Sequence, residues 1–293
     1  MKAFGDLVSA LAVVGLMGCS TGRSSAWEGP KEVQSAAQAA PADKLIAEGD
    51  EAWKNRNDAA SIEKAIASWE GAVAANPNDT ETLAKLPRAY YFLADAYYRG
   101  NDKYLDTFEK GVSAAERSMA TSNPEFKKIV TSGGSVEEAA QKLTPKEAES
   151  AYWYASSLGK WARAKGFSTV LGNKDRIKAV MGKVLEVKPD LFHGGPDRYW
   201  GGFYAVAPGF AGGDMEKSKK HFESSLQLAP YYLGTKVLMA DVYAVKVQDR
   251  ALFDKLLDEV LAAPDDINPD LIPETKAEKV KAKELKAKAK ELF

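Results

Sequence analysis

Hydrophobic positions recur at helical spacing from about residue 43 to the C-terminus. The segments that carry them are rich in Ala, Leu, Lys and Glu, and no stretch of useful length alternates as a half-buried strand does. Each segment stops at a proline step, where a helix cannot continue. These steps end at Pro77, Pro124, Pro189, Pro230 and Pro264. The pattern predicts an all-α domain over residues 43–293.

Two segments share the spacing of the second helix of a tetratricopeptide (TPR) repeat. Small residues stand where two helices approach closely, an aromatic ring lies between them, and a proline ends the helix. The first set is Ala65, Trp69, Ala72 and Pro77, and the second is Ser218, Phe222, Ser225 and Pro230. Of the proline intervals, only that from Pro230 to Pro264 equals the 34-residue TPR period. The repeats are therefore TPR-like but irregular.

About five helix pairs should stack into a short superhelix, because one pair cannot bury its apolar face alone. The first helices of the pairs are expected to include Leu45–Lys54, Leu86–Tyr98, Glu147–Lys165, Asp197–Ala207 and Thr235–Val247. The tail over residues 274–293 carries sparse apolar residues and predicts a C-terminal capping helix. Within it, the charged run Glu278–Lys290 is expected to be a solvated face.

The N-terminus predicts processing and membrane attachment. Residues 7–16 form an uncharged, mostly apolar run about half as long as a membrane span, which is typical of a signal peptide. Leu16-Met17-Gly18-Cys19 resembles the lipobox of bacterial lipoproteins, which implies cleavage after residue 18 and lipid on Cys19, the sole cysteine. Ser20 follows rather than Asp, which favours the outer membrane, facing the periplasm. An ordinary secretory signal with a chance cysteine is the alternative.

Residues 19–42 are predicted to form a lipidated, flexible tether. The stretch is rich in Ser, Ala, Gly, Gln and Pro, and it contains one aromatic residue, Trp27. Such a composition buries too little apolar surface to offset the entropy of ordering the chain. The resulting organisation is a signal peptide over 1–18, a tether over 19–42 and a helical domain over 43–293.

Charge and motif content argue against catalysis and nucleic-acid binding. The 40 Lys and Arg residues nearly balance 41 Asp and Glu residues, so the net charge is −1 and offers no basic surface for nucleic acid. His193 and His221 have no second histidine or cysteine at metal-ligand spacing, and they are expected at the surface or at caps. We predict a protein that is not an enzyme and needs no cofactor.

Residues 193–214 combine seven glycines with five aromatic residues, more than a TPR unit requires. Gly201 and Gly202 each cost about 1 kcal/mol of helix propensity, so something should approach the backbone there. The rings either fill the core or line an apolar cavity, the usual form of a small-molecule site. If the rings line a cavity, five residues are expected to contact the ligand, with Arg198 at the rim of the cavity. They are Arg198, Trp200, Phe203, Tyr204 and Phe210.

Trp200, Tyr204 and Phe210 are expected to face this cavity. Arg198 would then offer an anionic head group two parallel hydrogen bonds. The alternative is that Arg198 pairs with Asp197 or Asp214 and only fixes the turns.

The same region resembles the T-component family of TPR-protein-associated TRAP transporters (TatT). The resemblance rests on Gly194-Gly195-Pro196-Asp197-Arg198, on Pro208 to Asp214, on Lys217 to Phe222, on Tyr232 to Val237, and on two C-terminal motifs near Phe253 and Leu285. It implies a lipoprotein with an apolar cleft or pore in each protomer and assembly as a homotrimer. It also implies a periplasmic solute-binding P component as partner and a hydrophobic ligand passed to a membrane permease. A general TPR scaffold that organises envelope proteins is the alternative.

Several large aromatic residues outside that region exceed the needs of a minimal repeat. They are candidates for the surface that contacts the P component, and the alternative for each is core packing. They are Tyr90, Tyr91, Tyr97, Tyr98, Trp153 and Trp161.

Overall fold

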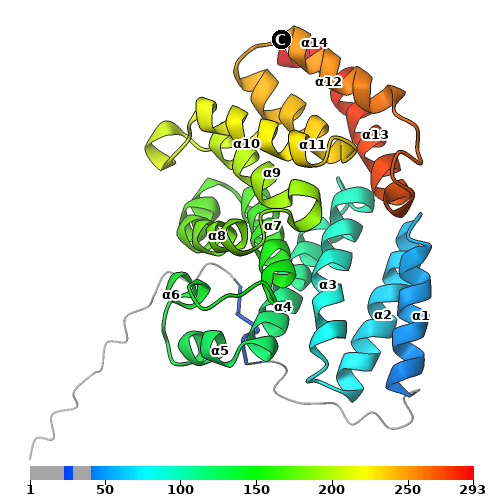
Figure 1. Ribbon diagram of the computed structural model, residues 1–293, viewed down its shortest axis with the longest axis vertical. Coiled ribbons are helices and arrows are strands. Elements are labelled where there is room, and N and C mark those ends of the chain that lie inside the picture. Colours follow the sequence, from blue (N-terminus) through cyan, green and yellow to red (C-terminus); the bar gives the residue numbers. More distant parts are fainter. Residues whose placement is uncertain (1–22, 29–40) are drawn as a thin grey trace, which may run out of the picture.

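Helices account for all the regular structure in the part of the chain that the computed structural model describes, residues 23–28 and 41–293 (Figure 1). The prediction of an all-α domain is confirmed. Residues 1–18, Cys19 and residues 29–40 lie outside the described residues, so the signal peptide and the lipidation site stay predictions. None of the described helices is both long enough and apolar enough to cross a membrane.

Five helix pairs follow one another along the chain. In each pair the second helix packs on the first. The pairs are α1 (Ala42–Lys54) with α2 (Ala59–Ala75), α3 (Thr80–Phe92) with α4 (Lys103–Ser122), α7 (Ala148–Lys165) with α8 (Phe167–Val187), α9 (Leu191–Val206) with α10 (Met215–Leu228), and α11 (Leu233–Leu238) with α12 (Arg250–Ala262). Such an arrangement is compatible with a TPR-like superhelix.

The remaining helices are short insertions and a C-terminal addition. Short α5 (Pro124–Thr131) and α6 (Val136–Ala140) lie between the second and third pairs, where the long proline interval indicated extra material. After the fifth pair come α13 (Ile272–Ala287) and α14 (Ala289–Leu292). Both α3 and α11 continue into a π-helical turn, over Leu93–Tyr97 and Met239–Ala244.

Helix ends follow the sequence signals closely. Helices α2, α4, α8, α10 and α12 each end two residues before the predicted proline stop, because the residue before a proline avoids the helical conformation. Several starts are capped by an aspartate that accepts a backbone N–H, as Asp58 does from Ser61 and Asp214 does from Lys217. Local chemistry therefore sets the length of each second helix.

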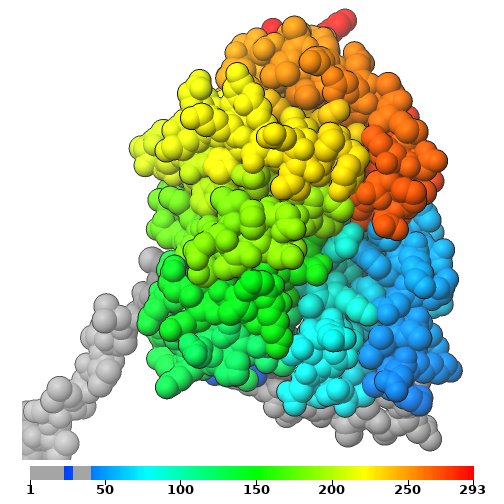
Figure 2. Space-filling view, in the orientation of Figure 1, coloured from blue at the N-terminus to red at the C-terminus, as the bar shows by residue number. Residues whose placement is uncertain are grey.

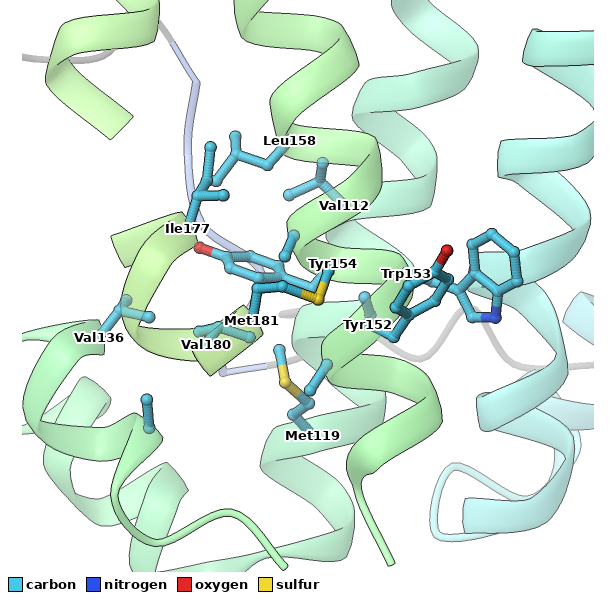
Figure 3. Close-up of a cluster of buried hydrophobic side chains, with 14 of the residues drawn as sticks. Val112, Met119, Val136, Tyr152, Trp153, Tyr154, Leu158, Ile177, Val180 and Met181 are labelled. Atoms are coloured by element: carbon cyan, nitrogen blue, oxygen red, sulfur yellow. The ribbon is translucent and has the colours of Figure 1, made fainter. Parts of the chain in front are cut away.

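The largest hydrophobic cluster lies among α4, α7 and α8 (Figure 3). Tyr154 of α7 points toward Ile177 and Met181 of α8, whereas the ring of its neighbour Trp153 points away from them (Figure 3). Both rings are buried. Helix α7 is thus covered on opposite faces, which explains its central place in Figure 1.

Helix α13 returns to the N-terminal helices, and Figure 2 shows its orange-red surface against the blue one. The contacts are ion pairs: Glu274 with Arg56 and Arg88, Glu284 with Arg99, and Lys281 with Asp95. The predicted capping helix exists, but the expectation that residues 278–290 form a solvated face is wrong for Glu278 and Lys281. Their side chains are largely buried because they pair with each other and, through Asp95, pack against the π-helical turn after α3.

Residues 23–28 lie against the helical domain, although they fall within the predicted tether. Trp27 is only 7% exposed and its ring packs edge-on against Phe126 and near Tyr154. Arg23 donates two hydrogen bonds to the carboxylate of Glu116, at 2.6 and 2.8 Å. The expectation that the stretch buries too little apolar surface to be ordered does not hold for these residues, because Trp27 and the buried Arg23–Glu116 ion pair dock them.

Candidate functional site

Two cavities adjoin among the helices. The larger, about 450 Å³, lies between α7, α8 and α9 and is lined mainly by apolar side chains; we call it the apolar cavity. The smaller, about 340 Å³, lies beside α13 and is lined by charged and aromatic side chains; we call it the polar cavity. Both are lined by Tyr91, Tyr152, Lys160, Arg198 and Leu238, which we call the junction.

The start of α9 has an unusual backbone. Phe192, His193 and Gly194 have φ of 44°, 58° and 70°, so three consecutive residues are left-handed. The first two carry side chains, for which this conformation is strained. The turn breaks the regular helix before Gly195 and brings its carbonyl oxygens toward Arg198.

Arg198 holds this turn together. Its guanidinium donates to the carbonyl oxygens of Phe192 and His193, at 3.2 and 3.1 Å. It also donates to the hydroxyls of Tyr152 and Thr235, at 3.1 and 3.4 Å. The alternative pairing of Arg198 with Asp197 or Asp214 does not occur. Arg198 does fix a turn, but it is the left-handed turn at Phe192 to Gly194, and the acceptors there are neutral carbonyl oxygens.

Glycines let the neighbouring helices approach α9. A Cβ on Gly201 would lie 2.8 Å from the Phe222 ring of α10, and one on Gly195 would lie 2.8 Å from the Tyr152 ring of α7. Real Cβ atoms do not approach that closely, so alanine would not fit unchanged at either position. The expected close approach at Gly201 is therefore a helix-helix contact. Gly202, by contrast, lines the apolar cavity.

The five predicted ligand residues do not share one wall. Arg198 and Phe203 line the apolar cavity, together with Tyr199 and Val206 of the same helix. Trp200 and Tyr204 are not among its lining residues, because the helix directs them toward His221 of α10, where Tyr204 stacks on the imidazole. Trp200 is a core residue.

Phe210 lies apart from the other four. It belongs to the short turn Gly209–Ala211, and its side chain is 82% exposed. The expectation that Trp200, Tyr204 and Phe210 face the cavity is wrong. The error is one of helix phase, since Tyr199, Phe203 and Val206 occupy the adjacent face.

Both histidines are partly buried rather than at the surface. His193 stacks on Tyr232, and burial together with Arg198 and Arg88 lowers its pKa below the usual value. Nδ1 of His221 lies 2.6 Å from Oδ1 of Asp197. No group of three or more potential metal-ligating side chains occurs in the described part of the chain.

An ion-pair network borders the junction. The carboxylate of Asp95 contacts the ammonium groups of Lys160 and Lys281. Burial raises the pKa of Asp95, but the two lysines outweigh burial and hold it well below its ordinary range. Lys281 also pairs with Glu278 at 2.7 Å. The network links α13 to α7 and carries no net charge.

Sequence reasoning missed most of the junction. Lys160 and Tyr152 of the junction, and Asp95 beside it, gave no local signal, since they lie on α7 and on the π-helical turn after α3, which only the fold brings together. Tyr91 and Trp153 were noted as surplus aromatic residues, and both line the polar cavity. The prediction that the surplus aromatic residues contact the P component is wrong for four of them, because their rings are buried in the core. They are Tyr90, Tyr98, Trp153 and Trp161.

Comparisons with known proteins cover most of the described helical domain. The sequence model of the family described as TRAP transporter T-component matches residues 103–293, which include every helix that lines the apolar cavity except α3. An uncharacterized protein of Treponema pallidum (strain Nichols) is 27% identical over 211 residues. That match covers 68% of this chain and 62% of the Treponema protein.

Proposed function

Because the chain belongs to the TRAP transporter T-component family, we propose that it is the non-enzymatic accessory lipoprotein of a TRAP transport system. In this role it holds a hydrophobic or amphipathic small ligand and docks a periplasmic solute-binding P component. The observation that carries the proposal is the apolar cavity. Its volume of about 450 Å³ falls within the range of small-molecule sites, and apolar walls with a few polar groups are typical of them.

Two helix glycines give a matched test of ligand binding. Gly159 lines the apolar cavity, and a Cβ there would lie 3.8 Å from Tyr199, so a leucine side chain would occupy ligand space. Gly182 of α8 lies outside the cavity lining, and its Cβ would lie 3.8 Å from Trp200. We expect Gly159→Leu to lose a co-purifying ligand, measured by native mass spectrometry of the detergent-purified full chain, and Gly182→Leu to retain it. Equal occupancy in both folded variants would contradict the cavity as the binding site.

A collar of exposed apolar residues surrounds the mouth of the apolar cavity. Phe167 and Leu171 of α8 and Val206 of α9 line the cavity and are 40 to 58% exposed. Phe210 lies in the same turn as Pro208 and Ala211, which also line it. We assign the P component to this collar, because a partner seated there covers the apolar surface and meets the ligand at its exit.

The collar has a control elsewhere on the surface. Val280 of α13 is 50% exposed and is not among the residues that line either cavity. We expect Val206→Glu to abolish recovery of the co-expressed P component in affinity purification, and Val280→Glu to leave it unchanged. Loss of the partner in both variants, or in neither, would remove the collar as the docking surface.

We further propose that a lipid on Cys19 anchors the protein to the outer membrane. We also propose that the protein assembles as a homotrimer. Three residues separate Cys19 from Arg23, so the four steps between their Cα atoms reach about 14 Å at full extension. The docked position of Arg23 would then keep α4 near the membrane. Cys19→Ser is expected to move the protein from the membrane to the soluble fraction, because the acyl chains supply the attachment. Retention in the membrane would oppose the anchor, and a monomeric mass in native mass spectrometry would oppose the trimer.

A further inference from the structure

The charges that line the two cavities differ in sign. Four cationic side chains line the apolar cavity, and no Asp or Glu is found among its described lining residues. They are Lys160, Arg163, Lys174 and Arg198. The polar cavity instead has four carboxylates beside its cations, so its charges nearly balance. Lys160 pairs with Asp95 and Lys174 with Asp175, whereas Arg163 and Arg198 form no ion pair with a described residue. The lining thus combines positive charge with apolar surface, which favours anions with a hydrocarbon part.

Arg198 contributes a buried charge without a counterion. The residue is 6% exposed, and all four protein acceptors of its guanidinium are neutral carbonyl or hydroxyl oxygens. Arginine stays protonated in proteins. A buried charge that lacks an opposite charge is costly, so an anion brought close to it would be stabilised.

The other junction groups are hydrogen-bond donors. Within the described residues the hydroxyl of Tyr91 has no hydrogen-bond partner, and burial raises its pKa well above the ordinary value, so the hydroxyl keeps its proton. The Tyr152 hydroxyl accepts from Arg198 and is left with its own proton to donate. The Lys160 ammonium uses one hydrogen bond on Asp95, at 2.8 Å. Three donors therefore converge where the two cavities meet.

We propose that the ligand of the apolar cavity is an anionic amphiphile whose head group lies at the junction and whose hydrocarbon tail extends between α7, α8 and α9. The head group accepts hydrogen bonds from Tyr91, Tyr152 and Lys160. Arg198 supplies charge from behind Tyr152, since the N–H groups of its two terminal nitrogens already donate to the protein. This inference rests on the proposed ligand-binding function and adds to it the sign of the charge and the orientation. Carboxylate and phosphate head groups share this chemistry.

Head-group chemistry can be varied at constant tail length. The detergent-purified full chain is stripped of ligand, and displacement of the neutral dye Nile red is measured for decanoate, decyl phosphate, 1-decanol and decylammonium. We expect one or both anions to bind at least about tenfold more tightly than decanol, a difference of about 1.4 kcal/mol that charge-assisted hydrogen bonds supply. Decylammonium should bind weakest. The tighter of the two anions identifies the head group.

Two cations one helical turn apart on α7 test the orientation. Lys160→Met should lower the affinity for the preferred anion at least about tenfold and leave that for decanol unchanged. Arg163 also lines the cavity but is more exposed than Lys160, so Arg163→Met removes a charge nearer the cavity mouth and should lower the affinity for the anion far less than Lys160→Met does. Tyr91→Phe provides a second junction variant. It removes the Tyr91 hydroxyl, which makes no hydrogen bond within the described fold. Thermal unfolding of each variant confirms that it is folded.

The outcomes distinguish failure of the anionic-ligand proposal from failure of the proposed ligand-binding function. Equal affinity for decanoate, decyl phosphate and decanol would overturn the anionic ligand while leaving a hydrophobic one. Loss of anion binding in Arg163→Met but not in Lys160→Met would place the head group at the mouth and overturn the orientation. Failure of every probe to displace the dye would count against the cavity as a ligand site, and so against the proposed function itself.

Discussion

The first and fourth helix pairs use the same packing device. In α1/α2 the ring of Trp69 lies against Gly49, and in α9/α10 the ring of Phe222 lies against Gly201. Added Cβ atoms at the two glycines would lie 2.5 Å and 2.8 Å from those rings. Each pair therefore fits an aromatic side chain of its second helix into a gap that only glycine leaves in its first helix.

The pairs differ in the small residues that flank the ring. In α2 these are alanines, which contribute packing alone, whereas α10 has Ser218 and Ser225. The Ser218 hydroxyl donates to the carbonyl oxygen of Gly201 at 2.7 Å. That of Ser225 shares a hydrogen bond with Thr235, which in turn accepts from Arg198. The repeat motif thus specifies how helices approach, while polar side chains at the same positions connect one pair to the site.

Removing the ring of Trp69 or of Phe222 should give the largest loss of stability, and the loss should be similar in the two helix pairs. Trp69→Ala and Phe222→Ala each delete a fully buried side chain, so each is expected to lower the free energy of unfolding by about 3–5 kcal/mol. Denaturant unfolding followed by circular dichroism measures this. Phe210→Ala, which removes an exposed ring, should change stability by less than about 0.5 kcal/mol. A loss confined to one pair would break the analogy between them.

Filling the glycine gaps should have a smaller effect. Gly49→Ala and Gly201→Ala are expected to cost about 1–3 kcal/mol through overpacking against the rings, partly offset by the better helix propensity of alanine. Gly202→Ala meets only the flexible end of Leu238, at 3.3 Å, and should be close to neutral. Gly49→Ala should cost little unfolding free energy when Trp69 is also alanine, and Gly201→Ala should cost little when Phe222 is also alanine. If the two costs in either double-mutant cycle simply add, the ring is not what excludes the alanine.

Exchanging serine and alanine sharpens the difference between the pairs. Ser225→Ala should cost about 1 kcal/mol and should also weaken ligand binding, because Thr235 then loses a partner beside Arg198. Ala72→Ser in the first pair should cost about 1–3 kcal/mol through a buried hydroxyl and leave ligand binding unchanged. Unfolding and dye displacement, measured on both variants, distinguish the two effects. Unchanged binding in Ser225→Ala would confine that serine to packing.

Most of the helical framework followed from local signals. Proline stops placed the ends of α2, α4, α8, α10 and α12, and small-aromatic-small spacing identified the packing of Trp69 and Phe222. Those features depend on neighbours along the chain. The docking of Trp27 did not follow, because composition describes the average of a segment and cannot show that one ring finds a pocket near Phe126.

The site was predictable only in part. The glycine-rich segment around Arg198 was located from its composition, and Arg198 and Phe203 do line the apolar cavity. Trp200 and Tyr204 were assigned to the wrong face, because helical spacing groups them together but does not indicate which face of α9 meets the cavity. Lys160 and Tyr91 join the site through contacts between distant repeats, which no spacing rule describes.

The smallest expected effect is a pH dependence that belongs to the fourth pair alone. His193 lies in the left-handed turn that begins α9, and burial, with Arg198 and Arg88 nearby, lowers its folded-state pKa. The unfolded chain therefore binds more protons below about pH 6.5, so the free energy of unfolding should fall as the pH drops through that range. His193→Asn keeps a residue that tolerates the left-handed backbone and removes the titration. Unfolding measured from about pH 7.5 down to pH 5.5 should show a weaker decline in this variant than in the unaltered chain. If the two declines coincide, His193 does not set the pH dependence, and the distinction between the two pairs reduces to their serines and alanines.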